Sequence, residues 1–560
     1  MGEKSIGKRF NLPLPRENKV RAENVTNTME QTVPRVSSSR FFKGTLILTV
    51  AGIIVKIIGS LNWIILSRVL GGEGIGIYQM AFPLYLLALS ISSAGIPVAI
   101  SIITAEKLAL NDYHGAERVF KTSLMLLFFS GFVMSILLYF GAGWLTDHRV
   151  IRDARAYYSL IALAPAIFIV TILASFRGYL QGWQLMTPTA VSQIVEQLFR
   201  VGTMLIFASV LLPKGLEFAA GGASLGAGAG AVAALMVLIY YYLRLQKNTT
   251  FSQPPVLDTP KTESSLHLLK RLAVLALPVS LSSIMLPLVA NLDLLVVPLR
   301  LETAGFSVAQ ATELFGYLTG MSVPLVNLAT ILTAALATSL VPAISLAYSL
   351  NNKQEVFYRT AGAMRLANIT TIPFGIMLLV LAQPIVSAIY HAPGAGDATR
   401  LMAAGVFLLG IHQVTTGILQ GVGRTAIPVI NMGVSAIFKF ALTWVLTAVP
   451  TLGIQGAAWA TLADIGIAAA LNLYFVYRYT GFFISAPDLI KNLIAGSVMG
   501  SLMWFGYTPL IIMLNNQLLT IGIILGLGML VYGVILLALG GINKRDIARI
   551  PVIGSLVKLR

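Results

Sequence analysis

The chain has 560 residues, of which 56% are hydrophobic and only 11% are charged, and its mean hydropathy is +0.82. Soluble proteins carry about 25% charged residues, so this composition excludes a soluble enzyme. The long apolar runs also lack the alternating pattern of a membrane β-barrel. The absence of cysteine excludes disulfides, thiol catalysis and cysteine-ligated metals.

The apolar segments follow one another along almost the whole chain, and each is long enough to cross a bilayer core, which needs about 20 residues. Fourteen such segments are expected, which predicts an all-α polytopic membrane protein with 14 transmembrane helices. The predicted regions are a disordered basic cytoplasmic tail at 1–43, helices 1–6 in 44–245, a cytoplasmic linker at 246–266, helices 7–12 in 267–480, helices 13–14 in 481–541, and a basic cytoplasmic tail at 542–560.

The net charge of +17 is distributed as a topology signal. With both termini placed in the cytoplasm, 28 of the 39 Lys and Arg residues fall on the cytoplasmic side and seven on the other, and four lie inside helices. Cytoplasmic loops of membrane proteins carry this excess, so the basicity gives no reason to expect nucleic acid as a partner. Arg149, Arg152 and Arg155 go against the rule, although acidic neighbours partly offset them.

The chain repeats itself at a spacing of roughly 240 residues. Tyr78-Gln-Met-Ala-Phe-Pro83 recurs as Tyr317-Leu-Thr-Gly-Met-Ser-Val-Pro324, and the order of the other matching segments is the same in both halves. Two homologous six-helix lobes that run in the same direction are therefore expected, an architecture typical of transporters. Prolines at matching positions bend helices and are candidate gating residues. They are Pro83, Pro97, Pro324 and Pro342.

Three cations, Lys56, Arg200 and Lys439, lie deep in predicted helices, where a charge costs about 2.5–3.5 kcal/mol on insertion scales. Lys439 follows Arg200 at the repeat spacing, so both lobes place a cation on the equivalent helix. Lys and Arg bind phosphate through charge-assisted hydrogen bonds, which predicts a cavity for a phosphorylated substrate. Two alternatives remain open: Glu196 forms a purely local ion pair with Arg200 one turn away, or Asp464 pairs with Lys439 and neutralises the site.

Three carboxylates are candidates for coupling transport to a cation, namely Glu196, Asp293 and Asp464. No zinc motif, P-loop or nucleophile set is present in the sequence. The chain is therefore not expected to be an enzyme, and no metal or cofactor is expected.

The segment from Lys56 to Gln79, continuing through Ala94-Gly-Ile-Pro97-Val-Ala-Ile-Ser101, resembles the stage V sporulation protein B and polysaccharide-biosynthesis branch of the MOP exporter superfamily, which includes Gram-positive lipid II flippases. The resemblance covers nearly all of residues 40–545. It implies a MATE-like fold of two lobes, and helices 13–14 that line a groove for a lipid tail. It also implies that basic residues in the cavity contact the diphosphate group of the substrate. In the first helix of related flippases from Gram-negative bacteria, two basic residues recur. Lys56 stands at the first of these two positions, and Asn62 stands at the second in place of a basic residue.

These features predict a flippase that moves an undecaprenyl-diphosphate-linked saccharide, most simply lipid II, to the outer leaflet of a bacterial cytoplasmic membrane by alternating access. Cell-wall synthesis proteins are candidate partners, beside the lipid-linked saccharide and the bilayer. Three alternatives are a cation-coupled multidrug exporter of the same superfamily, a flippase for another polysaccharide repeat unit, and a non-transporting scaffold of cell-envelope synthesis.

Overall fold

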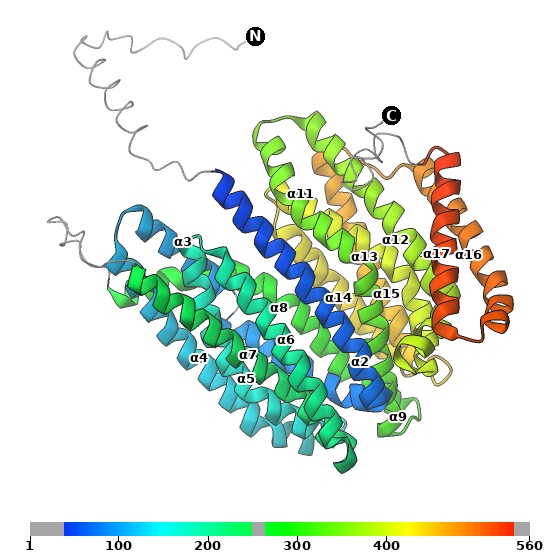
Figure 1. Cartoon of the computed structure of the whole chain (residues 1–560), viewed down its shortest axis with the longest axis horizontal. Helices are drawn as coiled ribbons and strands as arrows, with labels where there is room; N and C mark the ends of the chain where they lie inside the picture. Colours follow the sequence, from blue (N-terminus) through cyan, green and yellow to red (C-terminus); the bar gives the residue numbers. More distant parts are fainter. Residues whose placement is uncertain (1–37, 94, 249–263, 542–560) are drawn as a thin grey trace, which may run out of the picture.

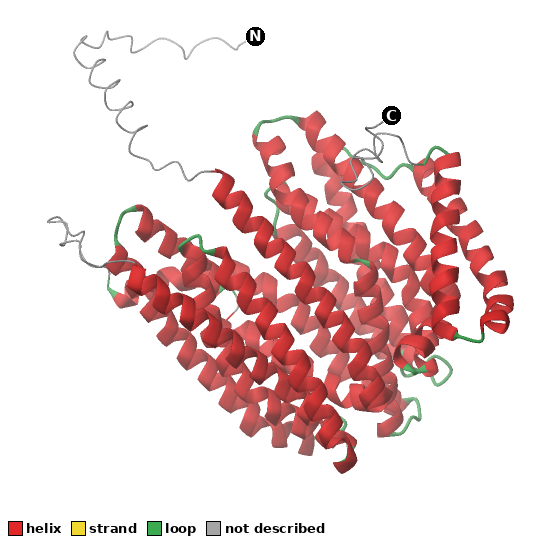
Figure 2. Cartoon of the chain, viewed as in Figure 1, coloured by secondary structure: helices red, strands yellow, loops and turns green. Residues whose placement is uncertain are grey.

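The computed structural model describes residues 38–93, 95–248 and 264–541, and all of the regular structure in these ranges is helical (Figure 2). Most of the predicted tails and linker lies outside the described residues. Within them, two helical lobes stand side by side (Figure 1), as expected. The first lobe consists of α2 (Ser38–Ser93), α3 (Ile96–Ala109), α4 (Tyr113–Asp147), α5 (Tyr157–Gly182), α6 (Met186–Leu211) and α7 (Leu216–Asn248).

The second lobe repeats this order with an interrupted second helix. It consists of α8 (Ser265–Thr303), α9 (Val308–Gly316), the π-helix η3 (Tyr317–Ser322), α10 (Val323–Ala329), α11 (Ile331–Ser349), α12 (Lys353–Tyr390), α13 (Gly396–Gly421), α14 (Ala426–Leu446) and α15 (Ile454–Thr480). Two last helices, α16 (Ala486–Leu514) and α17 (Gln517–Ala538), lie against the far side of this lobe (Figure 1).

Thirteen helical stretches of the described chain are long and apolar enough to cross a membrane. The first of them, Val50–Ala109, has 60 residues and would be about 90 Å long as one straight helix, three times the thickness of a bilayer core. Its backbone breaks at Gly71, where φ is 66° and ψ is −175°, a conformation that glycine adopts readily. The two halves of this stretch are separate crossings, so the predicted count of fourteen fits.

The repeat is visible in how the second helix of each lobe is interrupted. In the first lobe the chain breaks at Gly95 and resumes with α3, and in the second it breaks at Thr330 and resumes with α11. Among the four prolines predicted to bend helices, Pro83 and Pro342 lie inside helices, and Pro97 occupies the first turn of α3, where a proline breaks no backbone hydrogen bond. Pro324 directly follows η3 with helical backbone before it, so it also lies inside a continuous helical run. The gating role of all four stays a prediction.

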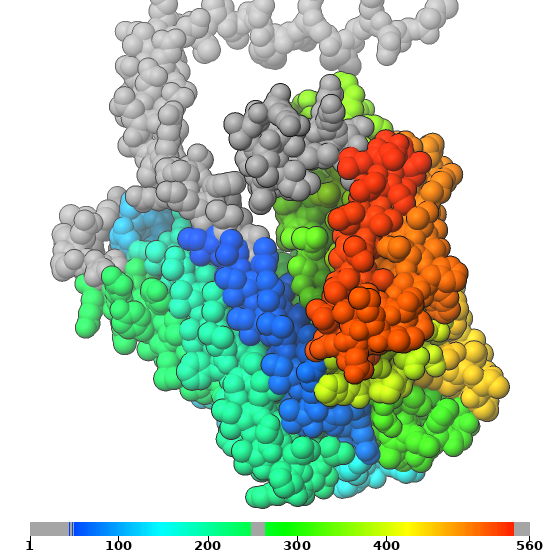
Figure 3. All heavy atoms as spheres, turned by 45° about the vertical axis from the view of Figure 1, so that its right-hand side comes forward, coloured from blue at the N-terminus to red at the C-terminus, as the bar shows by residue number. Residues whose placement is uncertain are grey.

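The two ends of the bundle differ in how the lobes meet, and we name the ends after Gly71 and Ser38. At the Gly71 end, a Cβ on Gly76 would clash with the backbone of Thr312, and one on Gly316 would clash with the backbone of Gly72. This close packing joins α2 to α9 across the lobes. Toward the Ser38 end, the surface is hollowed between the first half of α2 and the second lobe (Figure 3).

Gly316→Ala is therefore expected to destabilise the fold by about 1–3 kcal/mol, the usual range for overpacking, because the added methyl group has no room against Gly72 and Gly76. The midpoint of thermal unfolding of the detergent-purified protein measures this. Gly362→Ala is the matched control, since a Cβ at Gly362 meets no atom within 4 Å. Equal midpoints for the two variants would contradict the close approach.

Polar contacts fix α16 and α17 to α12. The Tyr532 hydroxyl donates to Asn492 Oδ1 at 2.7 Å, which joins α17 to α16, and it also lies 3.3 Å from the Ile369 carbonyl of α12. Gln517 Nε2 donates to the Pro384 carbonyl at 3.2 Å. These bonds hold the last two helices as an attachment to the second lobe, and the lipid-tail groove assigned to them stays a prediction.

Candidate functional site

The first lobe holds a cluster of three charged side chains between α5 and α6, which we call the Arg–Glu–Arg cluster (Arg177, Glu196 and Arg200). Glu196 accepts a hydrogen bond from Arg177 Nη2 of α5 at 2.9 Å and one from Arg200 Nη2 of its own helix, α6, at 2.6 Å. The predicted contact between Glu196 and Arg200 is thus present. With two guanidinium groups and one carboxylate, the cluster carries a net charge of +1.

The cluster is only partly covered, so its cations are not sealed off. The exposed fractions of the Arg177, Glu196 and Arg200 side chains are 18%, 14% and 23%. Arg200 Nε has no hydrogen-bond partner in the described chain, although a buried donor usually has one. The arrangement retains donor capacity for an anion. Guanidinium groups suit phosphate oxygens because they present several N–H donors in one plane.

A glycine stripe of α7 positions the cluster. A Cβ on Gly226 would clash with the Arg200 carbonyl, and one on Gly230 with the Glu196 carbonyl. The absence of side chains at these positions lets α7 pack directly on the backbone of α6, as small residues do between membrane helices. The Gly226 to Gly230 stretch therefore serves close packing between α7 and α6.

The first half of α2 brings a further predicted residue, Asn62, against α6. Asn62 is 5% exposed, its Nδ2 donates to Met204 Sδ at 2.9 Å, and its Oδ1 has no partner in the described chain. Met204 is one helical turn from Arg200. Asn62 is thus held near the Arg–Glu–Arg cluster by packing against α6.

Lys56 is exposed, and within the described residues its ammonium group makes no hydrogen bond or ion pair. At 100° per residue it shares a face of α2 with Ser60 and the fully buried Ser67, and it lies opposite the exposed side chain of Leu61. Lys56 therefore shares its face of α2 with Ser60, Trp63 and Ser67, and it points away from the exposed Leu61.

The third predicted cation, Lys439, is held inside the second lobe. Its Nζ donates to Asp293 Oδ2 of α8 at 2.7 Å and lies 4.0 Å from Asp464 Oδ2 of α15, while Ser435 donates to Asp464 Oδ1 at 2.5 Å. The Lys439 side chain is 5% exposed. The sequence left open whether Lys439 binds phosphate or pairs with a carboxylate, and this geometry favours the pairing. Lys439 is therefore not part of the proposed substrate site. A mobile cation at Asp293 and Asp464 would have to compete with this ammonium group.

Sequence reasoning missed Arg177, because the topology count includes it among the 28 cytoplasmic cations. In the structure it lies within α5 and shares Glu196 with Arg200. The available signal was Glu196 itself, since one carboxylate so deep in a helix can bridge two cations. Within the described ranges, no group of three or more His, Asp or Glu side chains is placed to hold a metal ion.

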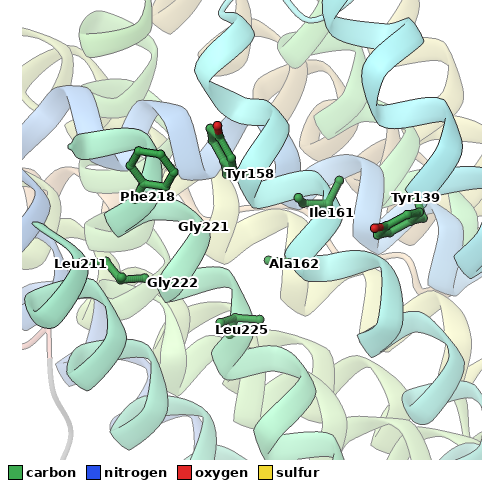
Figure 4. A pocket seen from close by; sticks show the side chains of 9 residues that line it. All are labelled: Tyr139, Tyr158, Ile161, Ala162, Leu211, Phe218, Gly221, Gly222 and Leu225. Carbon is green, nitrogen blue, oxygen red and sulfur yellow. The ribbon is translucent and has the colours of Figure 1, made fainter. Parts of the chain in front are cut away.

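A shallow apolar hollow of about 310 Å³ lies elsewhere in the first lobe, between α4, α5, α6 and α7 (Figure 4). It contains no charged side chain and is lined by Tyr139, Tyr158, Ile161, Ala162, Leu211, Phe218, Gly221, Gly222 and Leu225. Because none of the predicted binding residues lines it, this hollow is not a candidate for a phosphate group.

Comparison with known proteins supports the same architecture. Stage V sporulation protein B of Bacillus subtilis (strain 168) is 29% identical over 526 residues, which cover 93% of this chain and 100% of that protein. Lipid II flippase MurJ of the same organism is 26% identical over 485 residues, which cover 83% and 87%. A solved structure of lipid II flippase MurJ in an inward closed conformation matches 90% of this chain and all of that chain, with a TM-score of 0.62 at 16% identity.

Two family models match directly. The model described as MatE matches residues 318–445. The model described as polysaccharide biosynthesis protein matches residues 41–347, which is more than half of the chain. The chain therefore belongs to the polysaccharide biosynthesis protein family, within the MOP exporter superfamily of membrane transporters.

Proposed function

We propose that this protein is a flippase that moves an undecaprenyl-diphosphate-linked saccharide, with lipid II as the first cargo to test, from the inner to the outer leaflet of a bacterial cytoplasmic membrane. The observation that carries the proposal is the net positive charge of the Arg–Glu–Arg cluster, together with a Lys56 ammonium group that has no partner in the described chain. The relatives add that one of them is a lipid II flippase by name.

The shape of the molecule supports alternating access. The lobes are in contact at the Gly71 end, and the surface between α2 and the second lobe is hollowed toward the Ser38 end (Figure 3). The positive-inside rule places the Ser38 end in the cytoplasm. A head group that enters from the cytoplasm would meet Lys56 and the cluster at mid-depth, while its polyprenyl tail stays in lipid along α16 and α17.

Charge explains why transport would run outward. Moving a negatively charged head group out of a cell with an inside-negative potential gains about 2.3 kcal/mol per charge for each 100 mV. The protein would then need cations only to lower the barrier inside the membrane, where Arg200 lies near the middle of α6 and Arg177 reaches the same carboxylate from α5. Coupling to a counter-ion through Glu196, Asp293 or Asp464 stays a prediction.

The test is reconstitution of the whole chain in vesicles, with translocation of fluorescent lipid II followed by accessibility to a membrane-impermeant quencher. We expect translocation of lipid II or of another polyprenyl-diphosphate saccharide, but not of a polyprenyl-linked sugar without phosphate. Export of cationic drugs alone would favour the multidrug exporter. The absence of any translocation, from a protein that retains its thermal unfolding midpoint, would favour the scaffold.

A further inference from the structure

Two of the three arginines that violate the positive-inside rule, Arg152 and Arg155, lie where the two lobes meet at the Gly71 end. We define the clasp as Arg152 and Asp153 of the first lobe together with Glu302 and Thr312 of the second. These four residues come from the α4–α5 connection, the end of α8 and the first turns of α9. The clasp lies far from the Arg–Glu–Arg cluster along the bundle, so it is a separate feature.

Asp153 is the centre of the clasp. Its side chain is 4% exposed, and its carboxylate accepts hydrogen bonds from the backbone N–H and the guanidinium of Arg155 at 2.7–3.2 Å. Across the lobe boundary, Thr312 Oγ1 donates to Asp153 Oδ2 at 2.8 Å. Burial by itself would raise the pKa of Asp153, but the hydrogen bonds from Arg155 and Thr312 outweigh burial and lower it. The carboxylate is therefore charged at neutral pH.

Two further ion pairs stabilise the clasp. Arg155 Nη1 lies 2.8 Å from Glu73 Oε1, which fixes the orientation of Arg155 toward Asp153. Arg152 Nε lies 3.7 Å from Glu302 Oε1 across the lobes, with both side chains about one-fifth exposed. That Glu302 oxygen is buried and has no hydrogen bond in the described chain. The polar contacts of the clasp across the lobes are thus one short hydrogen bond and one long ion pair, and they add to the close packing of α2 on α9 at the same end.

We propose that the clasp is the outer closure of the transport pathway, and that Asp153 and Thr312 must separate each time cargo leaves. This inference rests on the proposed transport function. It also explains two of the three exceptional positive charges at this end. Arg152 and Arg155 are retained there by their carboxylate partners, whereas the exposed Arg149 of the same loop has no hydrogen bond or ion pair in the described chain.

The absence of cysteine from the chain makes a trapping experiment direct. Cysteines replace Asp153 and Thr312 in one full-length variant, and a short bifunctional thiosulfonate joins them. We expect translocation to fall in proportion to the cross-linked fraction and to return on reduction, while each single-cysteine variant treated in the same way is unaffected. Undiminished translocation by fully cross-linked protein would overturn the clasp while leaving the flippase assignment intact.

A second readout needs no cargo. Gln79→Cys places a single thiol at a buried position whose side chain donates to the Thr319 carbonyl across the lobes. Thr312→Val in this background removes the clasp hydrogen bond, and should raise the rate of labelling by an impermeant maleimide roughly three- to tenfold, the shift expected from one hydrogen bond. Arg149→Ala is the matched control and should leave the rate unchanged.

The two proposals fail in different ways. If Thr312→Val labels at the wild-type rate, the clasp does not hold the lobes together and the inference is wrong. If Thr312→Val accelerates labelling but the wild-type protein translocates no lipid-linked saccharide, the clasp stands as a conformational closure and the flippase assignment fails.

Discussion

Lys439→Ala is expected to lower the stability of the protein by about 3–5 kcal/mol, the range measured when one partner of a buried ion pair is removed. The change leaves Asp293 and Asp464 facing each other inside the second lobe with no cation between them. At 5% exposure of the Lys439 side chain, water cannot replace the lost ammonium group. The midpoint of thermal unfolding in detergent measures the effect.

Two controls make this result specific. Lys439→Ala combined with Asp293→Asn removes one charge of each sign and restores the original net charge of the site, so it should recover much of the lost stability. Lys214→Ala removes a lysine that is exposed and has no described partner, and it should change nothing. If the double variant were no more stable than Lys439→Ala, charge would not be the reason for the loss.

The largest functional effect is expected at the Arg–Glu–Arg cluster. Hydrogen bonds to charged groups contribute about 1.5–3 kcal/mol each, and each 1.4 kcal/mol is a factor of ten. Arg177→Ala and Arg200→Ala should therefore each weaken binding of a polyprenyl-diphosphate saccharide by about ten- to a hundredfold and slow its translocation. The dissociation constant in detergent and the translocation rate in vesicles are the measurements, with Arg244→Ala, an exposed arginine at the Ser38 end, as the control.

Glu196→Gln separates an anion site from a structural ion pair, because the two predict opposite changes. In an anion site the neutral glutamine releases both guanidinium groups, so binding of the diphosphate should become tighter. In a structural pair the same change leaves Arg177 and Arg200 without their common carboxylate, so the protein should lose stability with no gain in binding. Weaker binding in all three variants would also count against a direct contact with phosphate.

The sequence predicted the contact between Glu196 and Arg200 because it is local, set by the 3.6-residue turn of one helix. It did not predict that Arg177 joins them, because that contact depends on how α5 packs on α6. The same limit applied to Lys439. Lys439 and Arg200 lie on the equivalent helices of the two lobes, α14 and α6. Equivalent positions in two lobes need not have equivalent surroundings. In the described residues, two carboxylates from other helices reach the cation in the second lobe but not in the first.

Composition, hydropathy and spacing along the chain were enough to predict the membrane class, the fourteen crossings and the duplication into lobes. The sequence also marked Arg149, Arg152 and Arg155 as exceptions to the topology rule without a reason. The ion pairs between helices, such as Arg177 with Glu196 and Lys439 with Asp293, depend on how the helices pack, because the distance between two helices in sequence does not say whether they touch. Packing across the lobes made Asp153 a partner of Thr312 and left Lys56 without one.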